Sequence, residues 1–314
     1  MADIPVEILP EAKSDEVNWV TAGMETPIKN QQQCGSCWAF AVMGVVENAF
    51  KIAGGKELDT SEQALVDCDS NNAGCSGGWL NTAINWVKNN GVFLESDYPY
   101  TAKQASCKKS SKSAKSGYTV TGYGQLSGGE NALKAAVEKQ SVTVAVDASN
   151  WYLYQSGIFD KSSKCSGRVN HAVNVVGYGR ENGKDFWLVR NSWGTSWGES
   201  GYMKLLRGSG NGQGMCSVAK YGYWPKVQVS DSEKEEDKSE PDSPDEGEDP
   251  NCVGCDKQWW KSPECVKCLV NMKSLKHKWF KSDMSNLTDE QEQILADELW
   301  EIKNDFERSL EHEN

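Results

Sequence analysis

The chain has 314 residues, enough to bury a sizeable core in one large domain or two smaller ones. Its formal net charge of −12 arises outside the main body: residues 1–229 carry 22 basic and 21 acidic side chains, residues 230–250 carry 2 and 11, and residues 251–314 carry 9 and 13. A neutral main body does not support nucleic-acid binding, and no segment approaches the roughly 18 uncharged apolar residues of a membrane span.

Three helices are expected in the first third of the main body, after irregular residues 1–30. Residues 37–53 are apolar on nearly every side, which is typical of a helix buried all round. Capping residues favour a short helix at about 61–68, and clustered glycines then force a tight passage into a third helix near 79–89. The N-terminus has no basic segment followed by an apolar one, so we expect any export signal and propeptide to be absent from this chain.

The pattern changes from helices to strands after about residue 118. One more helix is expected at 129–139. Runs of β-branched and aromatic residues between Gly-rich turns predict strands at 142–146, 172–178, 186–189 and 202–206. Helices first and strands second predict an α+β protein of two packed lobes with a cleft between them.

An acidic segment separates this body from a C-terminal extension. Residues 230–250 contain only Ser, Asp, Glu, Lys, Pro and Gly, so there is nothing to bury and a disordered linker is expected. Beyond it, a capping box at 288–291 begins an amphipathic stripe that reaches Leu310, and a shorter stripe precedes it. Residues 251–314 are therefore expected to form a small Cys-containing helical module.

The four cysteines of the extension leave two interpretations open. Cys252, Cys255, Cys265 and Cys268 form two C-x-x-C pairs with the spacing of a zinc site, but an oxidising compartment favours two disulfides that pin a helical hairpin. The glycosylation sequon at 286–288 coincides with the expected helix cap. The extension resembles no family that we can name, and the sequence does not identify its partner.

Cys37 lies at the start of the first expected helix, three residues after Cys34. Unpaired N–H groups and the positive end of the helix dipole favour an anion there, so the pKa of the thiol falls and the cysteine is placed to be a nucleophile. The segment from Cys34 to Cys37 is also a C-x-x-C, which could serve as a redox dithiol or as half of a zinc site. Taken alone, the three alternatives have similar weight.

Counts of cysteine and histidine narrow the chemistry of the main body. Seven of the 11 cysteines lie in residues 1–229, which allows three disulfides with one thiol left over and suggests an oxidising compartment. His171, at the start of a predicted strand, is the only histidine before residue 230 and thus the single candidate base for Cys37. Asn191 ends the next strand, and antiparallel pairing could bring its amide to the imidazole as the third group of a triad.

Several motifs, in order along the chain, resemble those of the papain-type cysteine proteases. The resemblance rests on Gln31, on Cys34-Gly35-Ser36-Cys37-Trp38-Ala39-Phe40, on Cys75-Ser76-Gly77-Gly78, on Asn170-His171-Ala172-Val173 and on Asn191-Ser192-Trp193-Gly194. The spacing of 134 residues from Cys37 to His171 also fits that family. The resemblance covers about 15–226 and implies a papain-like α+β fold, with a helical lobe, a β-barrel-like lobe and a cleft between them.

The resemblance implies a role for each residue of a catalytic site. Cys37 would be the nucleophile, His171 the base and acid, and Asn191 the group that orients the imidazole. Gln31 would donate its amide to the oxyanion together with the Cys37 N–H, and Trp193 would cover the Asn–His hydrogen bond. The resemblance also implies the disulfides Cys34–Cys75, Cys68–Cys107 and Cys165–Cys216. With that pairing the redox and main-body zinc alternatives fail, and no cofactor or metal is expected.

A protein or peptide substrate is expected to bind in extended conformation along the cleft. Gly77 and Gly78 would pair with its backbone, and an apolar pocket implies an apolar residue at P2, two before the scissile bond. The residues expected to contact substrate are Gly77, Gly78, Trp79, Leu80, Ala145, Val169, Asn170, Ala172, Trp193 and Tyr221. Trp79 and Leu80 can also be read as helix core, and Tyr221 is larger than the residue in many relatives, which leaves the pocket depth open.

The sequence therefore predicts a papain-like cysteine endopeptidase, since it lacks the long His-bearing insertion of the exopeptidase relatives. We expect residues 1–229 to form a monomeric catalytic domain from a lysosomal, vacuolar or secreted compartment, with no nucleic-acid or membrane partner. The alternative is a catalytically silent papain-fold binding or scaffold protein that acts through its C-terminal module. The presence of Gln31, Cys37, His171 and Asn191 favours the enzyme.

Overall fold

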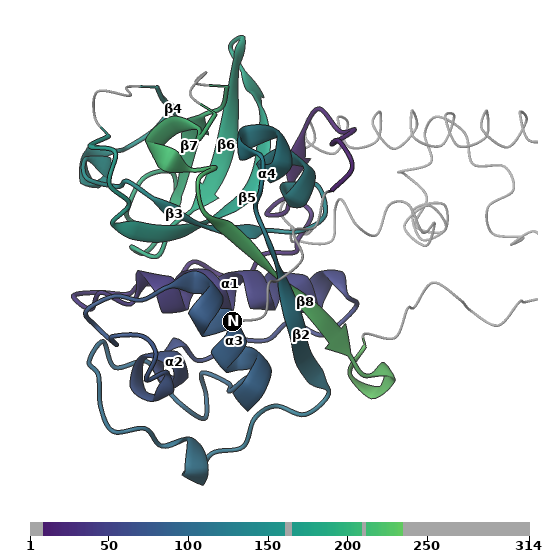
Figure 1. Cartoon of the computed structure of the whole chain (residues 1–314), viewed down its shortest axis with the longest axis vertical. Coiled ribbons are helices and arrows are strands. Elements are labelled where there is room, and N and C mark those ends of the chain that lie inside the picture. The colour runs from purple at the N-terminus through teal and green to yellow at the C-terminus, as the bar shows by residue number, and fades with distance from the viewer. Residues whose placement is uncertain (1–8, 161–164, 209–211, 235–314) are drawn as a thin grey trace, which may run out of the picture. The chain divides into compact units, whose positions relative to one another are not determined.

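A computed structural model describes residues 9–160, 165–208 and 212–234, all within one compact unit, Met1–Glu236. Figure 1 shows this unit as a lobe of helices and a lobe built on a sheet. No helix among the described residues is long and apolar enough to cross a membrane. The predicted helical module at 251–314, its four cysteines and its sequon lie outside the described residues.

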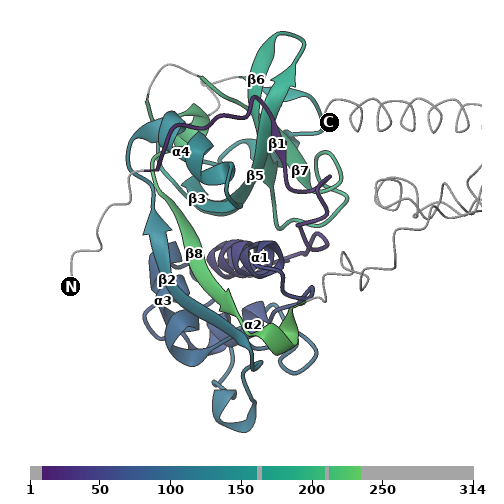
Figure 2. The same cartoon turned by 90° about the vertical axis from the view of Figure 1, so that its right-hand side faces the viewer.

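The helical lobe is organised around α1 (Cys37–Ile52), in which every residue from Trp38 to Phe50 is buried. Figure 2 shows this helix end-on, with other elements on several sides of it. It is followed by α2 (Glu62–Cys68) and α3 (Leu80–Asn90). Ser61 caps α2, because its hydroxyl accepts a hydrogen bond from the Ala64 N–H at 3.1 Å. The three helices expected in this part of the chain are confirmed.

The strands form one sheet, most of which builds the second lobe, with the strand order β2-β8-β3-β5-β6-β7-β4 and β1 paired to β5 off that path. The fourth helix, α4 (Gly129–Val137), ends two residues before the expected position. Short 3₁₀ turns lie at Lys109–Ser111, Trp151–Leu153, Met215–Ser217 and Asp231–Glu233. The strands are β1 Val17–Asn18, β2 Tyr118–Gln125, β3 Val142–Val146, β4 Ile158–Phe159, β5 His171–Glu181, β6 Lys184–Arg190, β7 Tyr202–Leu206 and β8 Gly222–Val229. The α+β architecture and the four predicted strands are confirmed.

Four strands were not expected from the sequence: β1, β2, β4 and β8. In β2, Gly124 interrupts the β-branched pattern. The position needs a glycine, because a Cβ atom there would lie 2.1 Å from the Trp224 ring of the paired strand. In β8, Pro225 reads as a strand breaker, and only the first half of the strand is continuously buried. The strands β1 and β4 have two residues each, too few for any periodic signal.

The first described residues pack on the sheet lobe, whereas β2 and part of β8 pack on the helical lobe. Leu9 and Val17, which precede the helices, pack against the core of the sheet lobe. Tyr118 and Val120 of β2, with Tyr223 of β8, belong instead to the core around α1. The long β2–β8 pair therefore ties the two lobes into one folding unit, visible in Figure 1 where it descends beside α1.

Residues Ser230–Lys234, which we call the clasp, lie on the helical lobe just beyond β8. The Ser230 N–H donates to the Gly117 carbonyl at 2.8 Å, and Lys234 forms an isolated bridge with Gly55. Glu233 pairs with Lys115 at 2.9 Å. The start of the linker, expected at residue 230, was therefore placed too early in the chain. Residues 230–234 dock through hydrogen bonds and charge, and an argument from apolar burial does not detect such contacts.

Candidate active site

Cys37 occupies the first position of α1 and is the free cysteine of the described residues. Burial raises the pKa of its thiol above the ordinary value, while backbone hydrogen bonds to Ala172, Trp38 and Cys37 itself act in the opposite direction. These N–H groups include unpaired donors of the helix N-terminus. The sulfur therefore lies where a developing negative charge finds backbone donors, and the thiol itself is partly exposed. The lowered pKa expected from the sequence is not found in the resting thiol, because burial outweighs these donors.

His171 begins β5 and Asn191 directly follows β6, and the antiparallel pairing of these strands brings the two side chains together. Their atoms Nε2 and Oδ1 are 2.8 Å apart. Because the amide oxygen accepts, Nε2 carries the hydrogen and Nδ1 keeps its lone pair. The Asn191 oxygen also accepts from the Ser192 N–H at 2.8 Å, which fixes the amide orientation.

The indole of Trp193 stacks on the His171 ring, with centroids 4.8 Å apart and planes inclined by 29°. Trp197 packs edge-on against Trp193 at 5.2 Å and donates its own N–H to the Trp151 carbonyl at 3.0 Å. Burial lowers the pKa of His171 to about 4. Burial opposes an isolated imidazolium and an isolated thiolate alike, so a proton that moves from the thiol to the imidazole creates both charges together as mutual counter-ions.

Gln31 is buried beside the start of α1, and three hydrogen bonds hold its side-chain amide and its N–H. Its Nε2 donates to the Cys34 carbonyl at 3.0 Å, its Oε1 accepts from the Ser192 hydroxyl at 2.7 Å, and its own N–H donates to the Ser192 carbonyl at 2.8 Å. The amide is therefore fixed between the segment before Cys37 and the segment after Asn191. Ser192 belongs to the Asn191–Gly194 motif. Its bond to Gln31 joins residues 161 positions apart, so nothing in the sequence indicated this contact.

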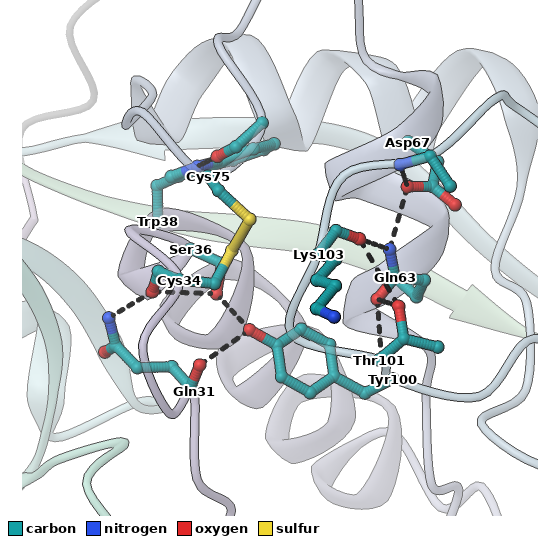
Figure 3. The surroundings of a disulfide bond; sticks show 12 residues. Gln31, Cys34, Ser36, Trp38, Gln63, Asp67, Cys75, Tyr100, Thr101 and Lys103 are labelled. Atoms are coloured by element: carbon teal, nitrogen blue, oxygen red, sulfur yellow. Dashed lines mark hydrogen bonds between the residues drawn. A yellow bond between two sulfur atoms is a disulfide. The ribbon is translucent and has the colours of Figure 1, made fainter.

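Three disulfides staple the described unit. The pairs are those that the resemblance implies: Cys34–Cys75, Cys68–Cys107 and Cys165–Cys216. Figure 3 shows Cys34–Cys75 close to Gln31 and Ser36. Since Cys34 is bonded to Cys75, the C-x-x-C does not act as a dithiol. Within the described residues, no group of three His, Cys, Asp or Glu side chains could hold a metal ion.

An open cleft of about 510 Å³ runs past Cys37 and His171, with walls from both lobes. Eight of the residues expected to contact substrate line it: Gly77, Gly78, Trp79, Leu80, Ala145, Val169, Asn170 and Ala172. Trp193 is not among its lining residues and contacts His171 instead. Tyr221 is also outside the lining, but its ring meets that of Trp79 edge to face at 5.6 Å.

The cleft has further wall residues that were not expected to contact substrate: Asn71, Asn72, Ala73 and Ser76, the last of which belongs to the Cys75–Gly78 motif. Asn72 orders this wall, because its Oδ1 accepts from the Trp79 N–H at 2.7 Å and its Nδ2 donates to Asp69 at 2.7 Å. Trp79 is about half exposed and Leu80 is fully buried, so the core interpretation holds for Leu80 alone. Polar loop residues of this kind carry no periodicity from which the wall could be predicted.

Comparison with known proteins gives one family. The model of the papain family cysteine protease matches residues 13–225. Chymopapain of Carica papaya is 44% identical over 212 residues, which cover 67% of this chain and 59% of the relative, and digestive cysteine proteinase 1 of Homarus americanus is 46% identical over 223 residues, 68% of each. The solved structure of the bromelain protease from Ananas comosus in complex with the E64 inhibitor is 38% identical, with a TM-score of 0.65, and covers 68% of this chain and 99% of that one. The chain therefore belongs to the papain family of cysteine proteases.

Proposed function

We propose that the protein is a cysteine endopeptidase in which Cys37 is the nucleophile, His171 the general base and acid, and Asn191 the orienting residue. The observation that carries the proposal is the 2.8 Å contact of His171 Nε2 with Asn191 Oδ1, since His171 lines the same cleft as the free thiol of Cys37. With Nε2 committed to Asn191, Nδ1 is the nitrogen left to exchange a proton with Cys37.

In the proposed reaction, Sγ of Cys37 attacks the scissile carbonyl carbon while its proton passes to Nδ1 of His171. The carbonyl π electrons move onto oxygen, and Gln31 Nε2–H with the Cys37 N–H donates to that oxyanion. As the intermediate collapses, the C–N bond breaks and the leaving amine takes the proton from His171. Water, deprotonated by the same imidazole, then cleaves the thioester and regenerates the thiol.

The cleft walls support an extended peptide substrate with an apolar residue at P2. Gly77 and Gly78 leave their backbone accessible for pairing with a strand, and Ala145, Val169 and Ala172 form an apolar wall. Trp79 lines this region and is backed by its edge-to-face contact with Tyr221, so we propose that medium aliphatic side chains fit better than bulky aromatic ones. Because the sequence contains no long His-bearing insertion, we propose cleavage within chains rather than from their ends.

The setting of this activity is also a proposal, because the matched region spans 59% of the chymopapain relative. Three disulfides fit an oxidising compartment. A lysosomal, vacuolar or secreted location satisfies that requirement. We propose that the catalytic unit acts as a monomer without a cofactor.

The proposal is tested by alkylating the unreduced protein with iodoacetamide and mapping its peptides. We expect one modification within residues 9–234, at Cys37, and a loss of activity on a fluorogenic peptide with an apolar P2 residue that parallels the modification. Cys37→Ala should abolish hydrolysis. Hydrolysis that survives Cys37→Ala would overturn the mechanism, and an intact, unmodified protein that binds the peptide without cleaving it would favour the silent binding protein.

A further inference from the structure

We infer that Tyr100 is a positioning residue of this site: its hydroxyl holds the Ser36 side chain away from the first turn of α1 and ties Ser36 to the Gln31 backbone. The inference rests on the proposed function, since it concerns how Cys37 and Gln31 are presented. Figure 3 shows the Tyr100 hydroxyl reaching the backbone of Gln31 and linked to Ser36.

Hydrogen-bond counting fixes the direction of each bond around this hydroxyl. Tyr100 donates its one proton to the Gln31 carbonyl at 2.8 Å. The Tyr100 oxygen also lies 2.6 Å from Ser36 Oγ, so Ser36 must be the donor in that pair. The Cys34 carbonyl, at 3.4 Å, is the weaker alternative for the Ser36 proton. Ser36 is completely buried, so water does not compete for its hydroxyl.

Ser36 is the N-cap residue of α1, a position at which a serine oxygen normally accepts from the second or third N–H of the helix. Among the described residues its side chain makes no such capping bond. The N–H groups of Cys37 and Trp38 instead interact with the Cys37 sulfur. By engaging Ser36, Tyr100 keeps these donors available to the thiolate and to the oxyanion.

Rigid elements hold Tyr100 in place. Its ring packs edge-on against Phe40 of α1, with centroids 4.8 Å apart, and its N–H donates to Glu95 at 2.7 Å. The next residue, Thr101, donates its N–H to the Gln63 side chain of α2 at 2.8 Å, and Gln63 in turn donates to the Lys103 carbonyl at 2.7 Å. The hydroxyl is thus presented from α1 and α2 together, and Figure 3 shows the links from Thr101 to Gln63 and from Gln63 to Lys103.

The same loop offers a matched control two residues earlier. Tyr98 also has a buried ring, and its hydroxyl donates to Asp67 at 2.8 Å and accepts from the Lys108 N–H at 3.1 Å. These partners do not touch Gln31 or Ser36. Tyr98→Phe therefore removes a hydroxyl of similar structural value and leaves the presentation of Cys37 unchanged.

The test measures kcat, KM and the pH dependence of the iodoacetamide alkylation rate at Cys37. Tyr100→Phe keeps the ring contact with Phe40 and should lower kcat about tenfold with little change in KM, the effect of one lost hydrogen bond. It should also move the alkylation midpoint upward by about one pH unit, because Ser36 is then free to cap the helix. Tyr98→Phe should leave kcat and the midpoint as in the wild type.

Ser36→Ala tests whether Tyr100 acts on Cys37 through the Ser36 side chain. In the Tyr100→Phe background it removes the competing cap, so the alkylation midpoint should return to that of Ser36→Ala alone. The titratable groups facing this region are His171 across the cleft and Glu62 and Glu95 beside Tyr100, and none is altered in these variants. Urea unfolding of each variant shows whether any loss of activity reflects unfolding.

Two outcomes overturn the inference: a Tyr100→Phe enzyme that behaves like Tyr98→Phe, or a raised midpoint that Ser36→Ala does not restore. Gln31→Ala and Cys37→Ala are assayed beside these variants. If Gln31→Ala leaves kcat unchanged, the oxyanion assignment of the proposed function fails, while the alkylation profile of Tyr100→Phe still decides whether Tyr100 positions Cys37.

Discussion

Single hydrogen bonds account for the orientation of the key side chains. Asn191 selects the tautomer of His171, and Ser192 holds the Gln31 oxygen so that the Gln31 NH₂ group points toward the start of α1. In the proposed mechanism, the Gln31 amide strengthens its interaction only when charge develops on the substrate oxygen. The geometry of this donor is already set before substrate binds.

Gln31→Ala should therefore lower kcat by roughly 10²- to 10³-fold with KM little changed, the usual cost of one oxyanion donor. Steady-state kinetics on a short peptide with an apolar P2 residue measure both constants. The neighbouring Gln32 is exposed and provides the matched control, since Gln32→Ala should leave both constants within twofold. A larger effect from Gln32 than from Gln31 would show that the register of the motif is wrong.

At the scale of elements, α1, α2 and the N-terminal segment meet at one partly buried cation, Lys29. Lys29 contacts Glu47 at 3.0 Å, Glu62 at 2.9 Å and Asp59 at 2.7 Å. Burial alone would raise the pKa of Glu47, but Lys29 and Arg190, with hydrogen bonds from Thr26 and Thr60, hold it below its ordinary value. Glu47 is therefore held in its charged form.

Glu62 has fewer partners than Glu47, and burial raises its pKa to about 8. Its Oε2 has no hydrogen-bond partner among the described residues. Between the ordinary value of 4.5 and about 8, the folded protein holds a proton that the unfolded chain releases. The stability contributed by this group is fully present below pH 4.5 and is lost as the pH rises through 8.

Glu62→Gln removes this titration. Compared with the wild type, its free energy of unfolding should fall less between pH 5 and pH 8, because the side chain is neutral throughout. Urea unfolding of the alkylated, disulfide-intact proteins at both pH values measures the difference. Asp59→Asn, which changes the exposed acid on the same lysine, is the control and should keep the wild-type slope. Equal slopes for the wild type and Glu62→Gln would contradict the assignment.

The elements also show how far sequence reasoning reaches. Uniform burial made α1 predictable, and runs of β-branched residues made β3, β5, β6 and β7 predictable, because burial of apolar side chains leaves a pattern. The His171–Asn191 pair was accessible through the same strands and through the family motif. Tyr100 was not, since two hydrogen bonds to distant residues leave no trace in periodicity, and glycine and proline masked the β2–β8 pair.

At the scale of the whole molecule, the clasp secures the end of the β2–β8 pair on the helical lobe. A chain that ends at Lys234 should match the full chain in kcat/KM and in stability of the catalytic unit. A chain that ends at Val229 loses the Ser230–Gly117 bond, the Glu233–Lys115 ion pair and the Lys234 bridge. Its free energy of unfolding should fall by about 1–3 kcal/mol, the sum expected for a few partly exposed contacts.

The activity of the shorter chain should stay within twofold of the wild type, because the clasp is remote from Cys37. Peptide hydrolysis and urea unfolding of the two truncated proteins distinguish the effects. Glu233→Gln in the longer chain isolates the ion pair. Equal free energies of unfolding for the two truncated proteins would show that the clasp lies on the helical lobe without stabilising it.

The clasp also fixes where a chain that ends at Lys234 presents its C-terminus. It touches Gly55 and Lys56, just past the last residue of α1, whereas the thiol is at the first residue. A helix of 16 residues is about 24 Å long. A bead, dye or carrier protein coupled after Lys234 would therefore be attached near the end of α1 that is farther from Cys37. The cleft would stay open to large substrates.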